Sequence, residues 1–240
     1  MKIVHVGWGH WPEHRLAGPI IYLHKLALTQ SCAGDDVTIV CASERELPGA
    51  GPYASLTDVV EGIPYVHLCN RPAKLHDFWN PLREAHDPDC ERAFDQVLSE
   101  LKPDVVHVHN FVGLSFDVVA AARRHSAAVL SSLHNYIPVC SRDDLFFADS
   151  ERCGGPLERS CGRCLGTLVS DDDYRTRHGA AVRALNDCDR VLAVSNRVAE
   201  IYARQGVDPA KLAVDRCGSC SSAPVCRARA RCTCSRPFAR

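Results

Sequence analysis

Long apolar runs are missing from this 240-residue sequence, and none approaches the length that a helix needs to cross a bilayer. The amino terminus is not expected to be a signal peptide either. The amino terminus, "MKIVHVGWGH", has one lysine and a short apolar run that polar residues interrupt, which predicts a first strand. We therefore expect a cytoplasmic protein with reduced thiols, and a peripheral position at the inner membrane surface stays open.

The short motifs of several enzyme classes are also absent. The first loop, "GWGHWPEHRLAGP", contains Gly7, Gly9 and Gly18 without the G-x-G-x-x-G spacing, which argues against NAD. No G-x-S-x-G, H-E-x-x-H or P-loop pattern occurs. A long loop with glycines before a helix still suits close approach of a ligand to the backbone. Arg15 in this loop is either a phosphate contact or a solvated side chain.

Acidic residues are absent from the arginine-rich segment at the carboxyl end of the sequence. Residues 216–240 hold six arginines and no acids, so they carry +6 and the remainder carries −7 within the net charge of −1. A basic tail on an acidic body can indicate nucleic-acid binding. The body offers no basic face to support that interpretation, so we expect no nucleic-acid partner. Apolar and charged fractions of 46% and 24% are those of a soluble globular protein.

Strand-like apolar runs alternate with helix-like stretches along the chain. This alternation predicts an α/β fold, a doubly wound parallel sheet of Rossmann-like type. The predicted strands span 2–8, 36–43, 63–70, 104–110, 128–135, 190–196 and 211–214. The predicted helices span about 19–33, 89–101, 114–126, 172–187 and 196–205.

Polar residues follow several of these strands at the point where each strand ends. "DVVHVHN" ends on His109 and Asn110, "LSSLHN" ends on His134 and Asn135, and "RVLAVSN" reaches Ser195. Because the carboxyl ends of parallel strands lie along one edge, these side chains are expected to converge on a ligand crevice. The alternative for each residue is a cap of a strand or helix, and Ser195 fits a helix N-cap in any case.

Fourteen cysteines fall into three groups, of which the middle one has metal-like spacing. Cys140-x12-Cys153-x7-Cys161-x2-Cys164 lies in an irregular segment, 136–171, which we interpret as a Cys-rich insertion. Four thiolates satisfy a closed tetrahedral zinc site, so the spacing predicts structural zinc and no catalytic metal. The alternative is a set of reduced free thiols.

Five segments in order resemble a known family. They are "KIVHVG…GP", "KPDVVHVHN", "LSSLHNYIPVC" with its later cysteines, "DRVLAVSN" and "YARQGVDPAKLAV". Together they resemble the amino-terminal half of family 4 glycosyltransferases of the GT-B fold. The resemblance covers about residues 1–214.

The resemblance implies two Rossmann-like domains facing across a cleft, of which this one receives the acceptor. It implies transfer from a UDP- or GDP-sugar to a glycan, lipid or small-molecule acceptor, with retention of configuration. By position, Gly18 matches the small residue that approaches the donor phosphates, His134 the histidine that reaches the transferred sugar, and His109 the acceptor-side strand end. The family has aspartate where this chain has Asn135, which argues against a charge-based role there.

The last segment, 215–240, differs in composition from everything before it. Its bias toward Arg, Cys, Ala and Ser predicts disorder or translation out of frame, with a second zinc knuckle as an alternative. We accordingly expect residues 1–214 to form the domain, the chain to be truncated, and the fragment to be inactive alone. Two rival functions remain: a non-catalytic zinc-stabilised sugar- or nucleotide-binding module, and another nucleotide-dependent Rossmann-like enzyme such as an epimerase. Sequencing the DNA beyond codon 214 in all frames would discriminate among them.

Overall fold

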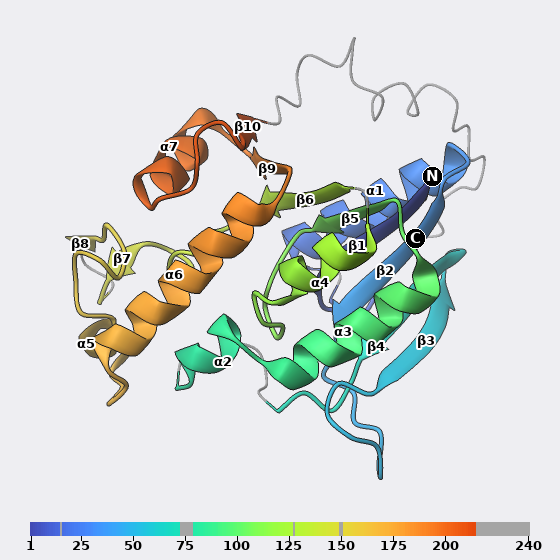
Figure 1. Cartoon of the computed structure of the whole chain (residues 1–240), viewed down its shortest axis with the longest axis horizontal. Coiled ribbons are helices and arrows are strands. Elements are labelled where there is room, and N and C mark those ends of the chain that lie inside the picture. The colour runs from blue at the N-terminus through green and yellow to red at the C-terminus, as the bar shows by residue number, and fades with distance from the viewer. Residues whose placement is uncertain (15, 73–78, 127, 149–150, 215–240) are drawn as a thin grey trace.

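A sheet of eight strands runs through the described part of the chain (Figure 1). The structure is a computed structural model and describes residues 1–14, 16–72, 79–126, 128–148 and 151–214. The strands lie in the order β10-β9-β6-β5-β1-β2-β4-β3, all parallel except β3, which pairs antiparallel with β4. Their bounds are β1 Lys2–Trp8, β2 Asp36–Ala42, β3 Ser55–Val60, β4 Ile63–Leu68, β5 Val105–Val108, β6 Ala128–Leu133, β9 Arg190–Ala193 and β10 Leu212–Val214.

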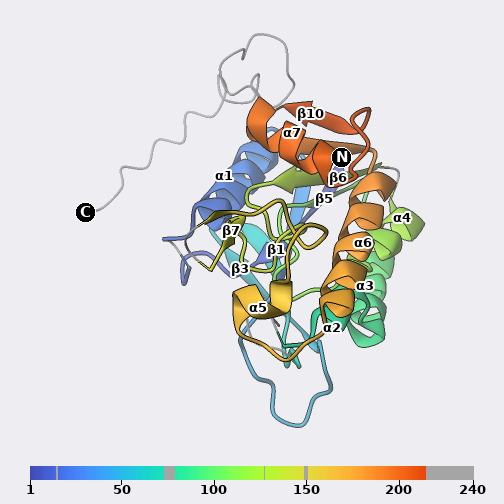
Figure 2. The same cartoon turned by 90° about the vertical axis from the view of Figure 1, so that its left-hand side faces the viewer.

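Helices cover both faces of this sheet (Figure 2). Helix α1 lies against β1 and β2 on one face, and α3, α4 and α6 lie on the other. The predicted doubly wound α/β fold is confirmed. The helix bounds are α1 Gly18–Cys32, α2 Pro81–Ala85, α3 Pro88–Leu101, α4 Val118–His125, α5 Cys161–Leu165, α6 Asp171–Asp187 and α7 Asn196–Arg204.

Strand β1 divides its side chains between two buried layers. Val4 and Val6 belong to the larger apolar cluster, which includes residues of α3, α4 and α6. Ile3 packs with Leu23 of α1 in a second cluster. Because side chains alternate along a strand, His5 shares the α1 side with Ile3. A histidine therefore occupies a position that an aliphatic residue normally fills.

The order of the strands reverses next to β1. The chain passes from β1 to β2, β3 and β4 on one side, and then returns to place β5 and β6 on the other. In sheets of this kind ligands bind outside the carboxyl ends of the strands at the reversal. The fold thus favours a site at the ends of β1 and β5.

All seven predicted strands and all five predicted helices are present, with bounds that shift by a few residues. The sequence did not reveal strand β3, which turns into β4 through Glu61 and Gly62, both with positive φ. It also did not reveal the short helices α2 and α5 or the hairpin of β7 (Phe146–Phe147) and β8 (Glu151–Arg152) in the Cys-rich insertion.

Two predictions concern residues outside the described ranges. The first is the phosphate contact predicted for Arg15. The second is the disorder, or alternatively the zinc knuckle, predicted for residues 215–240. Among the helices of the described ranges, none has the length and apolar character to cross a membrane.

Candidate functional site

A hollow of about 290 Å³ lies at the strand reversal. Its wall combines the end of β1, the start of α1, and the segments that follow β5 and β6. Among the predicted site residues, His109, Asn110 and Asn135 line it. The structure therefore brings together residues from both strand ends that carry the His-Asn pair.

Trp8 at the end of β1 also lines this hollow. Its indole N–H is buried and has no hydrogen-bond partner in the described part of the chain. A buried donor without a partner is costly, and such donors commonly serve a ligand. The sequence gives no signal for Trp8, because nothing in a sequence shows that an indole N–H has no partner.

Asn110 and Asn135 make the same local turn after neighbouring strands. The Oδ1 of Asn110 accepts from the N–H of Val112 at 2.6 Å, and the Oδ1 of Asn135 accepts from the N–H of Ile137 at 3.2 Å. Each side chain thus stabilises its own loop, as the capping alternative predicted. Because the oxygen is used in each turn, the amide Nδ2 is the group that remains to donate to a ligand.

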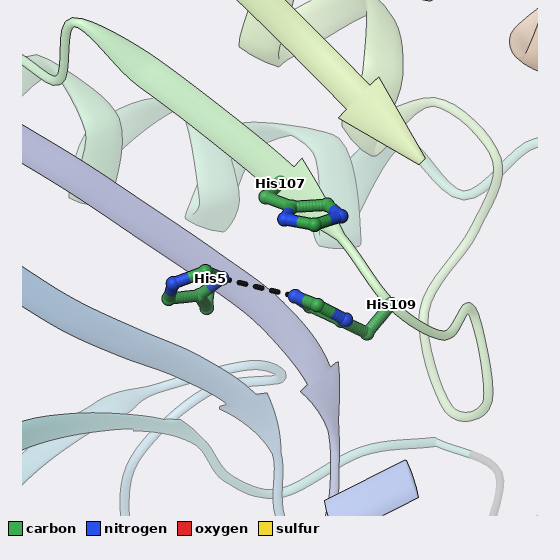
Figure 3. Close-up of side chains that lie close together, drawn as sticks. All are labelled: His5, His107 and His109. Carbon is green, nitrogen blue, oxygen red and sulfur yellow. Dashed lines mark hydrogen bonds between the residues drawn. The ribbon is translucent and has the colours of Figure 1, made fainter. Parts of the chain in front are cut away.

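A line of hydrogen-bonded side chains runs from α1 through the sheet toward His134, and Figure 3 shows its central pair, His5 and His109. His5 Nε2 lies 2.6 Å from Gln30 Oε1, and His5 Nδ1 lies 2.9 Å from His109 Nε2. His109 Nδ1 then lies 3.2 Å from His134 Nε2. His109 and His134 also stack, with ring centroids 5.5 Å apart.

These histidines are held neutral. Burial lowers the pKa of His5 to about 4, although the hydrogen bond to Gln30 raises it. Burial, followed by repulsion from His107 and His5, lowers the pKa of His109 well below its usual range. Burial also lowers the pKa of His134. At neutral pH each ring therefore carries one proton, on one of its two nitrogens.

The hydrogen bonds assign that proton along the whole line. Gln30 Oε1 can only accept, so the Nε2 of His5 carries the proton. The bare Nδ1 of His5 accepts from His109 Nε2–H, and the bare Nδ1 of His109 accepts from His134 Nε2–H. His134 is left with an unprotonated Nδ1, which is a hydrogen-bond acceptor and a base.

The amino terminus of α1 forms another part of the wall. Ala17 and Pro19 line the hollow on either side of Gly18, and no side chain caps this helix end. A Cβ added at Gly18 would meet no atom within 4 Å. Packing within the described chain therefore does not require glycine here, and the open space suits approach of a ligand to the backbone.

Ser195 is a helix N-cap, which was the alternative to a ligand contact. Its hydroxyl accepts from the N–H of Val198 and caps α7. It is not among the residues that line the hollow. His134 and Gly18 do not line it either, but they adjoin residues that do.

The four cysteines of the insertion lie in one neighbourhood. Burial raises the pKa of Cys161 to about 12, and the nearby Cys140, Cys153 and Cys164 raise it further by repulsion. Two sulfurs accept backbone N–H groups: Cys153 from Gly155 at 3.4 Å, and Cys164 from Ala148 at 3.5 Å. Bonds of this kind favour thiolates, although all four are free thiols in the structure.

Three groups of potential metal ligands in the described chain have their ligand atoms within 4.8 Å of one another, and the four cysteines do not form such a group. They are His5/His107/His109, His10/Asp58/His67 and His86/Glu91/Asp117. His5 and His109 of the first group belong to the hydrogen-bonded line, and His107 Nε2 lies 2.8 Å from Ser132 Oγ. Both nitrogens of His5 and of His109 and the Nε2 of His107 are therefore already engaged.

Comparison with known proteins identifies the family of this chain. Glycosyltransferase Family 4 matches residues 18–218. The chain belongs to this family. No curated protein matches it in sequence.

Solved structures extend the comparison to the fold. Sucrose-phosphate synthase from Thermosynechococcus elongatus superposes with a TM-score of 0.54 at 13% identity, over 89% of this chain and 47% of that one. HepE from Anabaena, in complex with UDP and glucose, superposes with a TM-score of 0.46 at 15% identity, over 89% and 43%. The superposition of this chain thus covers less than half the length of either of these two proteins.

Proposed function

We propose that this domain binds the acceptor in a retaining glycosyl transfer from a nucleotide sugar, and that the hollow at the ends of β1 and β5 is the acceptor site. The observation that carries the proposal is that Trp8, whose buried indole N–H has no partner in the described chain, lines a hollow at the strand reversal. Membership of glycosyltransferase family 4 gives the reaction type.

The groups around the hollow suit a saccharide hydroxyl. Trp8 and the amides of Asn110 and Asn135 offer neutral donors, and Asp143 adds one carboxylate to the lining. Neutral hydrogen-bonding groups beside apolar surface are typical of sites for small polar ligands. We propose that the lone pair on His134 Nδ1 accepts from a hydroxyl of the transferred sugar, and that the open space at Gly18 admits the donor phosphates at α1.

The second half of the reaction site belongs to a donor-binding domain in the family that this chain resembles. Transfer requires the donor diphosphate to be held and its developing charge to be neutralised while the acceptor is oriented. We therefore propose that the 240-residue chain binds acceptor-type saccharides and binds UDP- or GDP-sugars weakly. We propose no catalytic metal, and a structural zinc at Cys140, Cys153, Cys161 and Cys164.

Ligand-observed NMR of the 240-residue chain with a panel of saccharides tests the acceptor site. We expect binding that Trp8→Phe weakens about tenfold, because it removes the donor and keeps the aromatic surface. Trp79→Phe is the control, since Trp79 is 68% exposed. Equal binding by both variants would contradict the role of the hollow.

Activity assays test the reaction itself. Transfer and slow donor hydrolysis are measured with UDP- and GDP-sugars, and calorimetry follows donor binding. We expect no transfer from the isolated 240-residue chain. Tight donor binding without transfer, even when a donor-binding domain is supplied, would favour the non-catalytic binding module instead.

A further inference from the structure

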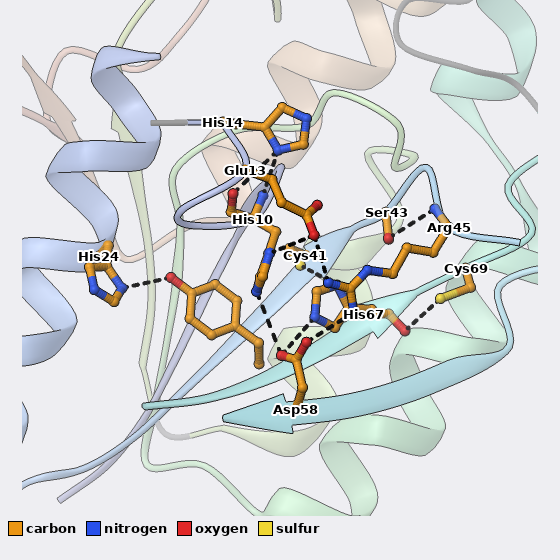
Figure 4. Close-up of polar contacts among 11 residues, drawn as sticks. His10, Glu13, His14, His24, Cys41, Ser43, Arg45, Asp58, His67 and Cys69 are labelled. Atoms are coloured by element: carbon orange, nitrogen blue, oxygen red, sulfur yellow. Dashed lines mark hydrogen bonds and ion pairs between the residues drawn. The ribbon is translucent and has the colours of Figure 1, made fainter. Parts of the chain in front are cut away.

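A second set of polar side chains meets at the β3–β4 edge of the sheet, separate from the hollow (Figure 4). His10 comes from the loop after β1, Asp58 from β3 and His67 from β4. We propose that these three residues bind a divalent transition-metal ion of the zinc class. The fold brings them together from positions up to 57 residues apart in the sequence.

The proposal is based on the buried imidazole of His10, which lacks hydrogen-bond partners among the described residues. The residue is 6% exposed, and neither ring nitrogen has a hydrogen-bond partner in the described chain. The nearest carboxylate oxygens, one from Glu13 and one from Asp58, both lie 3.6 Å away, beyond hydrogen-bond length. Burying an imidazole in this way is unfavourable unless something else binds it.

The distances between the proposed ligand atoms suit one metal ion. Asp58 Oδ1 lies 3.0 Å from His67 Nε2 and 3.6 Å from His10 Nε2, and all three atoms lie within 4.8 Å of one another. Tetrahedral zinc with bonds of about 2.0–2.2 Å separates its ligands by roughly 3.3 Å. The observed distances lie on either side of that value.

The donor types also favour zinc over harder cations. Two imidazoles and one carboxylate are common ligands of zinc, and calcium and magnesium prefer oxygen alone. With each Nε2 on the metal, each Nδ1 carries a proton. The Nδ1 of His10 then faces Glu13, and the Nδ1 of His67 faces the sulfur of Cys41 at 3.5 Å. Such outer partners orient metal-binding histidines.

The surrounding charge accommodates a cation. Arg45 binds Glu13 and the Oδ2 of Asp58, each at 2.9 Å. Two carboxylates and one guanidinium leave a local charge of −1, which a divalent ion compensates. Arg45 holds the far oxygen of Asp58, so that Oδ1 stays on the side of the histidines.

A metal here would fix one wall of the hollow. His10 lies two residues after Trp8, and Ala17 and Pro19 of the same loop and following helix line the hollow. Tying His10 to β3 and β4 therefore restrains the loop between β1 and α1. The inference stands apart from the proposed transfer, because zinc binding is measured without any sugar.

Zinc titration of the chelator-treated 240-residue chain tests the site. The Cys161→Ser background is used, so that the cysteine cluster does not contribute. We expect one equivalent of zinc to bind and to raise Tm by roughly 5–10 °C at a hundredfold excess over Kd. His10→Gln and Asp58→Asn should each abolish this equivalent, and His125→Gln, on α4, should not.

The spectrum of the cobalt-substituted protein identifies the ligands. We expect d–d bands without thiolate-to-cobalt charge transfer, and their loss in His10→Gln. If His10→Gln does not fold, as circular dichroism would show, Glu13→Gln replaces it, since it keeps all three ligands. We expect that variant to bind zinc roughly tenfold more weakly. An equivalent of zinc retained in folded His10→Gln and Asp58→Asn, or unchanged affinity in Glu13→Gln, would overturn the proposal.

Discussion

The tautomer of His134 is set by residues that are distant from it in the sequence. Gln30 on α1 fixes the proton of His5, His5 fixes that of His109, and His109 fixes that of His134. A neutral ring with a known bare nitrogen is the form that accepts a hydrogen bond from a sugar hydroxyl. The role of His134 therefore depends in part on Gln30 and His5, which do not line the hollow.

Replacing His134 by alanine should lower turnover about 100-fold in an active form of the enzyme. The loss of one positioned polar contact to the reacting sugar has this order of magnitude. The fold should persist, since His134 is only half-buried. Steady-state kinetics and the urea midpoint are measured together, with His86→Ala as an exposed control. Unchanged kinetics with unchanged stability would show that His134 does not take part.

Replacing Gln30 by leucine should shift the tautomers of the line without removing any histidine. The side chain keeps its approximate size and loses the oxygen that accepts from His5. We expect the ring ¹⁵N chemical shifts of His5 and His134 to move toward a mixture of tautomers. Gln96→Leu, on the exposed side of α3, is the matched control and should leave both spectra unchanged. Identical ring spectra in Gln30→Leu would mean that Gln30 does not set the tautomer.

The sequence identified part of this set of residues, for a physical reason. His109 and His134 end parallel strands, and the position of such an end follows from the apolar pattern alone. The contribution of Gln30, and the missing partners of Trp8 and His10, depend on contacts made only after the helices pack on the sheet. No local pattern encodes them.

At the scale of elements, the long helices and central strands could be predicted from the sequence because their local signals, such as N-caps and apolar runs, agree with the packing. Helix α6 begins with Ser170 as N-cap followed by three aspartates, and the caps Asp87 and Ser195 mark α3 and α7 equally clearly. Strand β3 was missed since it lies at an edge, with exposed positions throughout its length. Its apolar residues, Leu56, Val59 and Val60, neither alternate strictly nor form a continuous run, so the pattern does not distinguish it from a loop.

The Cys-rich insertion has too few regular elements to fold by packing alone. Its regular structure before α6 consists of a two-stranded hairpin and one helical turn. The four thiols repel one another once they are ionised. Zinc would convert this repulsion into attraction, with a binding free energy on the order of 10 kcal/mol at pH 7 that is also folding free energy. We therefore expect one zinc per chain at these cysteines.

Cys161→Ser should remove that zinc and increase hydrogen exchange over residues 140–164. Metal analysis of freshly reduced protein measures the first effect, and the thiolate-to-cobalt band of the substituted protein separates this site from the histidine site. Cys32→Ser, at an exposed position of α1, is the control. Equal zinc content in the two variants, or no thiolate band in the wild type, would leave the cysteines as free thiols.

At the scale of the whole molecule, the buried histidines make stability depend on pH. Burial lowers the pKa of His5 to about 4, and burial with repulsion from its neighbours lowers those of His107 and His109 well below 6.5. In the unfolded chain these groups titrate near 6.5. Between these values the unfolded state binds more protons, so stability rises with pH in this window.

The free energy of unfolding should therefore be fully developed above about pH 7 and decrease as the pH falls toward 5. Each such histidine contributes roughly 2 kcal/mol to this decrease. Urea unfolding in the presence of a chelator, at pH 7 and pH 5, measures it without interference from metals. His107→Gln keeps a side chain that can bond Ser132 but does not titrate, so we expect its decrease to be smaller by about one histidine's share. His86→Gln is the control, because His86 is exposed.

If wild type and His107→Gln lose the same free energy of unfolding between the two pH values, His107 is not held neutral by burial. The tautomers assigned to the neighbouring line of histidines then lose their basis.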